Sequence, residues 1–409
     1  MQDNNLGNNA VHVAARLSGT GPSPMMMLAA RAADLRAQGR NVISLATGEP
    51  DFDTPSHIQD AAVEAMRKGD THYTFVDGTK AAKAAVRDKF LRENELSFDE
   101  NEVGVYTGGK HVIFNALSAT VDPGDEVLFG LPTFPSYIDA IRYCGGVPVG
   151  VETQASGGWK LTPDSLDKAL SPKTRWVILN SPSNPTGSAY SRAELHALAA
   201  ILLRYPQVLV LSDDIYEHLL YSPEPFATIA QVEPKLASRT LTMNGLSKAY
   251  SMTGWRIAYA GGPAWLVKAM ATVASITVSC PSSISQAAAV AALTGPQDAR
   301  NAFAETFRQR RDLFVASLNQ APHLRCPLPD GAFYVFPSCE AAIGLVTPKG
   351  KRLASDADFA EYILDEANVA IVPGSTFGAP GHFRASFALD TQQLLEAAKR
   401  IKKATEALS

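Results

Sequence analysis

The sequence has 409 residues, 46% of them hydrophobic, and a formal net charge of -4. This length can bury a large core and allows two or three domains. The small net charge, with charged residues scattered along the chain, argues against nucleic acid as a partner.

The opening stretch "MQDNNLGNNA" is polar, and no uninterrupted apolar run of the kind found in a secretion signal or membrane span follows it. The run "PSPMMMLAA" is short and is interrupted by Pro24. We therefore expect a disordered tail that leads into an arm, and no membrane partner. The four cysteines are far apart and form no CxxC pair, which predicts reduced thiols in a cytoplasmic protein, without disulfides or a metal site.

From Pro55 to about Gly295, helical periodicity alternates with short β-rich runs. Such alternation is typical of βαβ units, and it predicts a large three-layer α/β/α domain with a mostly parallel sheet. The runs end in Gly, Pro, Ser, Asn or Asp, at the strand ends where open α/β sheets place their ligand-binding loops. The runs are "NEVGVYTG", "DEVLFGLP", "RWVILNSP" and "VLVLSDDIYE".

After Gly295 the pattern changes to a long charged helix over residues 298–320, then short strands and an amphipathic helix from Thr391. This pattern predicts a second, smaller α+β domain. The expected division is 1–50 for the arm and part of the small domain, 51–295 for the large domain and 296–409 for the rest of the small domain. The predicted strands are "GAFYVFP", "VAIVPG" and "HFRASFA".

Two loops in the large domain carry the first candidate site residues. "TGGKHVIFNAL", from Thr107, places two glycines before an apolar helix, whose free backbone N–H groups could hold a phosphate. A plain glycine turn that opens a helix is the alternative. "NSPSNPTG", from Asn180, ends a buried strand in a proline-braced loop that presents Asn184, and such loops are often only turns.

Two further segments carry charge in apolar or small-residue surroundings. Asp213 closes an apolar strand, where a carboxylate needs a cation or a donor; it either caps a helix or pairs with a ligand such as a protonated ring nitrogen. In "NGLSKAYSMTGWRIAY", Lys248 has few charged neighbours, with Arg256 eight positions later. An isolated lysine is usually a surface residue, but this setting indicates an enclosed amine of lowered pKa.

A phosphate cradle, a strand-end aspartate, an enclosed lysine and a nearby arginine are together what pyridoxal 5′-phosphate requires. The amine of Lys248 would hold the aldehyde as a Schiff base, while the glycine loop and Arg256 hold the phosphate. Asp213 would keep the pyridine nitrogen protonated, so that the ring accepts electrons.

The chain resembles the class I pyridoxal-phosphate aminotransferases of fold type I, and within them the bacterial aspartate and aspartate/prephenate aminotransferases. The likeness extends from about Pro22 to the C-terminal helix. It rests on ordered motifs: "GEPDFDTP", "THYTFVDG", "GGKHVIFNA", "NSPSNPTG", "SDDIYEHL", "NGLSKAYSMTGWRIAY", "GAFYVFPSC" and "FRASFA".

The resemblance implies how the cofactor is held at its covalent and phosphate ends. Lys248 would bind the aldehyde and then shuttle a proton between the substrate Cα and the cofactor. Gly109 and Lys110 would give backbone N–H groups to the phosphate, with Arg256 as its charged partner. Tyr73 would reach the phosphate in the neighbouring subunit, which implies a homodimer with shared sites.

The resemblance also implies contacts to the ring and the substrate. Asp213 would pair with the ring nitrogen, Tyr216 and Asn184 would bond the 3′ oxygen, and Phe134 would stack on the ring face. Arg384 would grip the substrate α-carboxylate, helped by Asn184 and the backbone of Gly48; the alternative for Arg384 is a surface residue on an edge strand. Lys110 matches a cation near the distal carboxylate of aspartate.

The chain departs from the family pattern at three places. Gly245 stands where many relatives have a phosphate-binding serine, so the set of phosphate donors is left open. Thr133-Phe134 stands where close relatives have Tyr-Trp. The run Met25 to Met27 replaces small and hydroxyl residues, and it could line an apolar pocket or pack in the arm.

The expected function is transfer of an amino group from an L-amino acid to a 2-oxo acid such as 2-oxoglutarate, in two half-reactions. The expected amino acid is aspartate or a neutral or aromatic one, because Lys110 favours a dicarboxylate whereas the departures widen the pocket. A lyase on the same scaffold is an alternative. A regulator that only senses the cofactor is another, but it would need a DNA-binding domain ahead of this fold.

Overall fold

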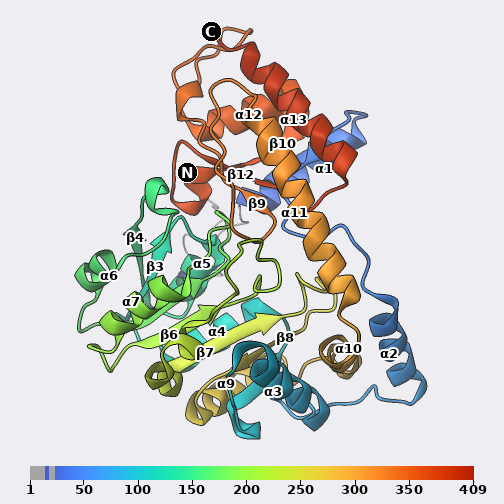
Figure 1. Cartoon of the computed structure of the whole chain (residues 1–409), viewed down its shortest axis with the longest axis vertical. Coiled ribbons are helices and arrows are strands. Elements are labelled where there is room, and N and C mark those ends of the chain that lie inside the picture. The colour runs from blue at the N-terminus through green and yellow to red at the C-terminus, as the bar shows by residue number, and fades with distance from the viewer. Residues whose placement is uncertain (1–13, 18–23) are drawn as a thin grey trace, which may run out of the picture.

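The computed structural model describes residues 14–17 and 24–409. Figure 1 shows a large sheet flanked by helices in the lower part of the molecule and the C-terminal helices above it. The polar tail expected over the first ten residues lies outside the described residues, as do the side chains of Met25 and Met26.

Within the described chain, the large sheet has seven strands in the order β2-β8-β7-β6-β5-β3-β4. Strand β8 runs antiparallel to both of its neighbours, and the remaining pairs are parallel. This confirms a mostly parallel sheet, with strand ends gathered at one edge. The strands are β2 (Val103–Tyr106), β3 (Glu126–Leu131), β4 (Val147–Glu152), β5 (Thr174–Asn180), β6 (Leu209–Asp213), β7 (Thr240–Gly245) and β8 (Ala258–Gly261).

Alternating side chains of the buried strands pack against helices on opposite faces of the sheet. In β5, Trp176 and Ile178 join one hydrophobic cluster with α4, α5 and α9, whereas Val177 and Leu179 join another with α6, α7 and α8. Because strand side chains alternate between faces, an apolar run buried on both sides gives three layers. These helices are α4 (Gly109–Thr120), α5 (Pro135–Tyr143), α6 (Pro163–Ala169), α7 (Arg192–Leu202), α8 (Ile229–Val232) and α9 (Ala264–Thr277).

A third hydrophobic cluster packs strands β2 and β8, at one end of the large sheet, against helices α2, α3 and α10. Helix α3 begins where the Thr79 hydroxyl accepts a hydrogen bond from the Ala82 N–H at 3.2 Å, which satisfies one of the free donors of its first turn. The helices are α2 (Ser56–Arg67), α3 (Lys80–Asn94) and α10 (Ser283–Thr294).

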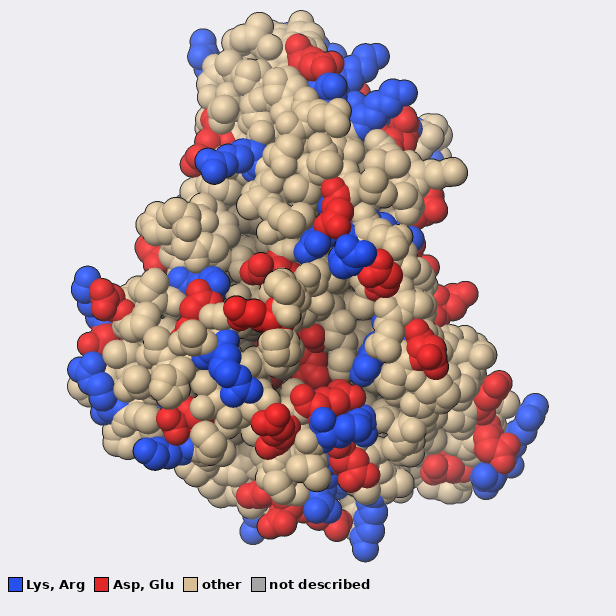
Figure 2. Space-filling model, viewed as in Figure 1, with Lys and Arg blue, Asp and Glu red and all other residues tan. Residues whose placement is uncertain are grey.

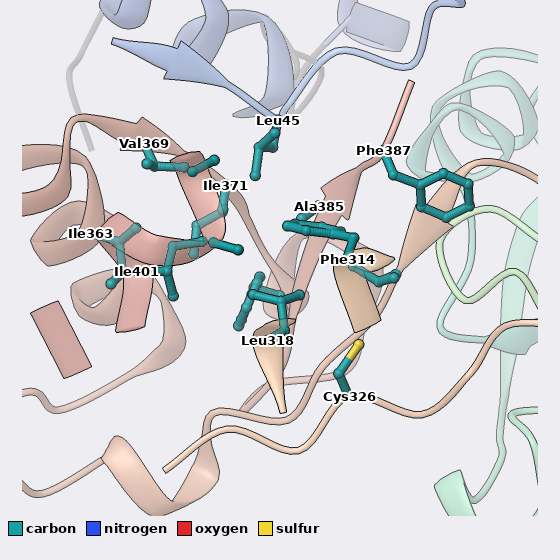
Figure 3. Packing of buried hydrophobic residues seen from close by; sticks show 14 of the residues in the cluster. Leu45, Phe314, Leu318, Cys326, Ile363, Val369, Ile371, Ala385, Phe387 and Ile401 are labelled. Atoms are coloured by element: carbon teal, nitrogen blue, oxygen red, sulfur yellow. The ribbon is translucent and has the colours of Figure 1, made fainter. Parts of the chain in front are cut away.

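The C-terminal part forms its own hydrophobic core, which Figure 3 shows from close by. Residues of α11, α12 and α13 pack there on short strands, and β1 pairs in parallel with β10, so the chain before Gly48 contacts this part. The elements are α1 (Pro24–Ala37), β1 (Ile43–Ser44), α11 (Asp298–Leu318), β9 (Tyr334–Val335), α12 (Asp356–Ala367), β10 (Val369–Ala370), β11 (Val372–Pro373), β12 (Phe383–Ser386) and α13 (Thr391–Glu406).

The strands and the long helices named from the sequence all appear, although β1, β4, β7 and β8 were not among the expected runs. The expected domain boundaries at residues 50 and 295 stay a prediction. None of the described helices combines the length and the apolar character needed to cross a membrane. On the face shown in Figure 2, acidic and basic side chains are interspersed.

Candidate active site

A cavity of about 440 Å³ opens at the carboxyl ends of the parallel strands, between the large sheet and the C-terminal part. All of the residues expected at the site line this cavity, with the exception of Tyr73. They are Gly48, Gly109, Lys110, Phe134, Asn184, Asp213, Tyr216, Lys248, Arg256 and Arg384. Tyr73 lies between α2 and α3 with 90% of its side chain exposed, away from the cavity of its own chain.

One end of the cavity is formed by the N-terminus of α4 and the side chain of Arg256. A Cβ at Gly108 would lie 2.3 Å from Nη2 of Arg256, and the φ of Gly108 is +85°, so this position requires glycine. Arg256 has a positive φ of its own and donates from Nη1 to the carbonyl of Thr253 at 3.0 Å. A helix N-terminus beside a guanidinium is suited to an anion such as phosphate.

Lys110, in the first turn of α4, adds a second cation at this end. Its Nζ lies 5.5 Å from the centroid of the Phe134 ring. Partial burial and the nearby charge of Arg256 lower the pKa of Lys110, while Asp139 opposes them. The ammonium therefore faces a region that favours an anionic group.

Asp213 ends β6 with its carboxylate buried beside the cavity. The hydroxyl of Tyr137 donates to Oδ2 at 2.5 Å, and the N–H of Ile215 donates to Oδ1 at 3.3 Å. Burial raises the pKa of Asp213 to about 6, although the Tyr137 hydrogen bond and the charge of Lys248 favour its ionised form. A carboxylate held in this way can stabilise a cation that approaches from the cavity.

The loop after β5 is fastened to the end of β6 by Asn180. Its Nδ2 donates to the carbonyl of Asp213 at 2.9 Å, and its Oδ1 accepts from the N–H of Asn184 at 2.8 Å. Asn184 in turn accepts a hydrogen bond from Arg384. The loop therefore connects the Asp213 wall of the cavity to the C-terminal part.

Lys248 follows β7, and its Nζ donates to the carbonyl of Gly48 at 2.5 Å. Desolvation lowers the pKa of Lys248 to about 8, and the charges of Arg384 and Arg256 act in the same direction. Glu49 and Asp213 oppose this shift. The amine is thus available in its neutral, nucleophilic form close to neutral pH, as the sequence indicated.

Arg384 lies on β12 with 2% of its surface exposed, which rules out the surface alternative. Nη1 donates to Oδ1 of Asn184 at 2.9 Å and Nη2 to the carbonyl of Ala46 at 2.7 Å. Its buried Nε finds no acceptor within the described part of the chain. The guanidinium therefore has N–H groups in reserve for an anionic ligand.

Tyr334 connects the two sides of the cavity and was not expected from the sequence. The Arg384 guanidinium carbon lies 4.5 Å from its ring centroid, and its hydroxyl is 2.9 Å from that of Tyr216. A Cβ at Gly48 would lie 2.3 Å from the same hydroxyl, so a side chain at position 48 would displace Tyr334. Tyr137 and Asn180 were also missed, because a tyrosine in an amphipathic helix and an asparagine at a strand end have the patterns of a core residue and of a turn.

The charges of the cavity fit a cofactor that carries a phosphate. The cationic side chains in its wall outnumber the carboxylates of Glu49 and Asp213. The N-terminus of α4 and Arg256 would hold the phosphate, Asp213 a protonated ring nitrogen and Lys248 an aldehyde. The site thus has a matching group for the phosphate, the ring nitrogen and the aldehyde of pyridoxal 5′-phosphate.

Comparisons with known proteins agree with this geometry. The family model "Aminotransferase class I and II" matches residues 40–401. The chain is 52% identical to an aspartate aminotransferase of Rhizobium meliloti over 97% of both chains, and 49% identical to an aspartate/prephenate aminotransferase of Cereibacter sphaeroides over 95% of this chain and 97% of that one.

Solved structures give the same result for the fold. The crystal structure of an aspartate aminotransferase from Rhizobium meliloti superimposes with a TM-score of 0.95 at 51% identity, over 98% of this chain and 100% of that one. An aspartate aminotransferase from Thermus thermophilus, solved with maleate, has a TM-score of 0.89 at 39% identity, over 96% of this chain and 100% of that one. The chain therefore belongs to the class I and II aminotransferases of fold type I, and it is a transaminase that depends on pyridoxal phosphate.

Proposed function

We propose that the described cavity carries out both half-reactions of amino transfer, with Lys248 as its catalytic residue. The observation that carries this proposal is the convergence of a buried amine of lowered pKa, the Asp213 carboxylate and the Arg384 guanidinium on one cavity. When bound, the cofactor supplies an aldehyde that condenses with amines and a ring that withdraws electrons.

Each role then falls to a particular group of this chain. Nζ of Lys248 takes up the proton that leaves the substrate Cα and returns it at the next step, a task that suits an amine with a pKa near neutrality. Asp213 keeps a proton on the ring nitrogen through its negative charge. The Gly109 and Lys110 backbone, with Arg256, holds the phosphate, while Phe134 covers the ring face.

The remaining polar groups hold the 3′ oxygen and the substrate. Tyr216 and Asn184 are the donors for the ring oxygen. Arg384 binds the α-carboxylate through its free N–H groups, as a fork that a lysine cannot imitate. The carbonyl of Gly48 accepts a hydrogen bond from the Lys248 amine in the described structure.

We propose a homodimer in which Tyr73 of each subunit reaches the phosphate end of the other site. Tyr73 is 90% exposed, and Phe75 and Ile276 are 67% and 81% exposed. Such a set of exposed large apolar side chains is suited to burial in an interface. We also propose a cytoplasmic location, supported by four unpaired cysteines.

For the substrates, we propose a dicarboxylic pair, glutamate and 2-oxoglutarate, as one partner and aspartate or a neutral or aromatic amino acid as the other. The Lys110 ammonium at the cavity supports an acidic substrate. The smaller Phe134 ring supports a wider pocket, whereas Met27, 61% exposed, does not line the cavity. Relatives include enzymes named for aspartate and for aspartate/prephenate, and a Thermus thermophilus variant was solved with tryptophan.

The test is the ratio of kcat/KM for aspartate to that for phenylalanine, measured in the wild type and in Lys110→Ala. Lys268→Ala, at an exposed position on α9, is the matched control. We expect a modest preference for aspartate that falls toward one in Lys110→Ala and is unchanged in Lys268→Ala. A preference for aspartate of several orders of magnitude that Lys110→Ala abolishes would exclude a neutral or aromatic amino acid as the partner. If Lys110→Ala leaves the ratio of kcat/KM values unchanged, Lys110 contributes only its backbone N–H.

A further inference from the structure

Tyr137 places a buried phenol directly on the carboxylate of Asp213. It lies in the first turn of α5 with 1% of its surface exposed, and its hydroxyl donates to Oδ2 at 2.5 Å. Its ring meets the Phe134 ring edge-on, with centroids 5.7 Å apart. The same helical turn therefore carries a ring at the cavity wall and a donor to the carboxylate behind it.

Asp213 depends on this donor more than on any other group around it. From the described residues, its second oxygen, Oδ1, receives only the longer 3.3 Å hydrogen bond from the Ile215 N–H. Within the described chain, the other charged and titratable groups that interact with it are Lys248 across the cavity and, on its own segment, Asp214 and Tyr216. A short hydrogen bond to an ionised group is among the strong ones in proteins.

The direction of this hydrogen bond is fixed by the chemistry of the pair. Burial and the charge of Asp213 hold the pKa of Tyr137 well above its ordinary value, so the phenol keeps its proton. It therefore always presents an O–H to the carboxylate, and it favours the carboxylate over the carboxylic acid. Asn180 fixes the Asp213 main chain independently, so the phenol acts on the side chain.

We propose that Tyr137 is a positioning residue for the reaction, which holds the Asp213 carboxylate ionised and in one orientation toward the cofactor ring. The inference rests on the proposed role of Asp213 opposite the ring nitrogen. Without the phenol, the Asp213 carboxylate rotates more freely and stabilises the protonated ring nitrogen less well. The ring then withdraws electrons less effectively. Cofactor affinity falls as well, because the ring nitrogen loses part of its ionic interaction with the Asp213 carboxylate.

The experiment is a double-mutant cycle of Tyr137→Phe and Asp213→Ala, with Tyr362→Phe as the matched control. The control deletes the same hydroxyl from a buried tyrosine of α12 that donates to the Ala404 carbonyl at 2.8 Å, remote from the cavity. Four quantities are measured on each protein: kcat, KM, the cofactor Kd, and the pH dependence of the visible absorption of the loaded enzyme. Thermal unfolding shows that each variant is folded.

We expect Tyr137→Phe to lower kcat by roughly tenfold to a hundredfold, the range for a lost hydrogen bond to a charged group, with little change in KM. Its cofactor Kd rises and its absorption titrates at a shifted pH, whereas Tyr362→Phe changes none of these quantities. In the Asp213→Ala background, the Tyr137→Phe change has no further effect on kcat or Kd.

Each outcome separates the positioning role from the proposed function. If Asp213→Ala is impaired but Tyr137→Phe retains wild-type kcat, Kd and pH titration, Tyr137 is only a core residue and the inference is overturned. Equal losses from Tyr137→Phe with and without Asp213 would also overturn it, since the phenol would then act elsewhere. If Asp213→Ala itself is fully active, the proposed role of Asp213 fails.

Discussion

Replacing Arg384 with lysine tests whether the fork at the end of the cavity recognises the substrate α-carboxylate. The arginine uses Nη1 and Nη2 on Asn184 and Ala46, and it keeps Nε and further N–H groups for a ligand. A lysine has three N–H donors at one point and no second arm. The variant thus forfeits at least one charge-assisted hydrogen bond, worth about 1.5–3 kcal/mol, and we expect kcat/KM to fall roughly tenfold to 150-fold.

The assay is the first half-reaction, followed by the change in visible absorption when excess L-amino acid is mixed with loaded enzyme. The same measurement with the corresponding amine, which lacks the α-carboxylate, is the internal control. We expect Arg384→Lys to slow the amino acid and to leave the amine unchanged. An equal loss of rate for both compounds would show that Arg384 supports the cavity without recognising the carboxylate. An unchanged rate with the amino acid would show that Arg384 does not bind the α-carboxylate at all.

Two further predictions concern the lysine and the shared site. The rate at which cofactor-free protein captures pyridoxal phosphate should rise with pH, reach half its maximum at about pH 8 and level off about one pH unit higher, because the pKa of Lys248 is lowered and only the neutral amine attacks an aldehyde; a rise that continues to pH 10 would indicate an ordinary lysine. Tyr73→Phe should raise the cofactor Kd with a smaller effect on kcat, and mixed dimers of Tyr73→Phe with Arg256→Ala should contain one doubly impaired site and one intact site. Fully active monomers would contradict the shared site.

Much of the fold could be predicted because the strong signals in this sequence are periodic. The strands β3, β5 and β6 appear as short β-rich runs, α11 as a long charged helical stretch and α13 as an amphipathic one. The strands that were missed carry weaker signals. Strand β4 is largely outside the core, and β8 consists of four small or aromatic residues within a longer motif.

The candidate site could be predicted where a residue stood out from its neighbours. Asp213 and Lys248 are charges in apolar or small-residue surroundings, and the cavity brings both together with Arg384, more than 130 positions further along the chain. Tyr137 and Tyr334 could not be found in this way, since a tyrosine in an amphipathic helix or a buried strand has the pattern of a core residue. Only the tertiary arrangement shows which groups their hydroxyls contact.

The exposed Tyr73 shows the opposite limit. Tyr73 does not line the described cavity of its own chain. Its role therefore rests on the family resemblance and on the proposed dimer. The packing of one chain does not show which groups such a residue contacts across an interface.

The most direct test of the account is to find where the cofactor is attached. The protein loaded with pyridoxal phosphate is reduced with borohydride and digested, and the labelled peptide is identified by mass spectrometry. We expect a single label on Lys248, lost in Lys248→Ala together with transaminase activity. A label on another lysine of the wild type, or full activity in Lys248→Ala, would contradict it.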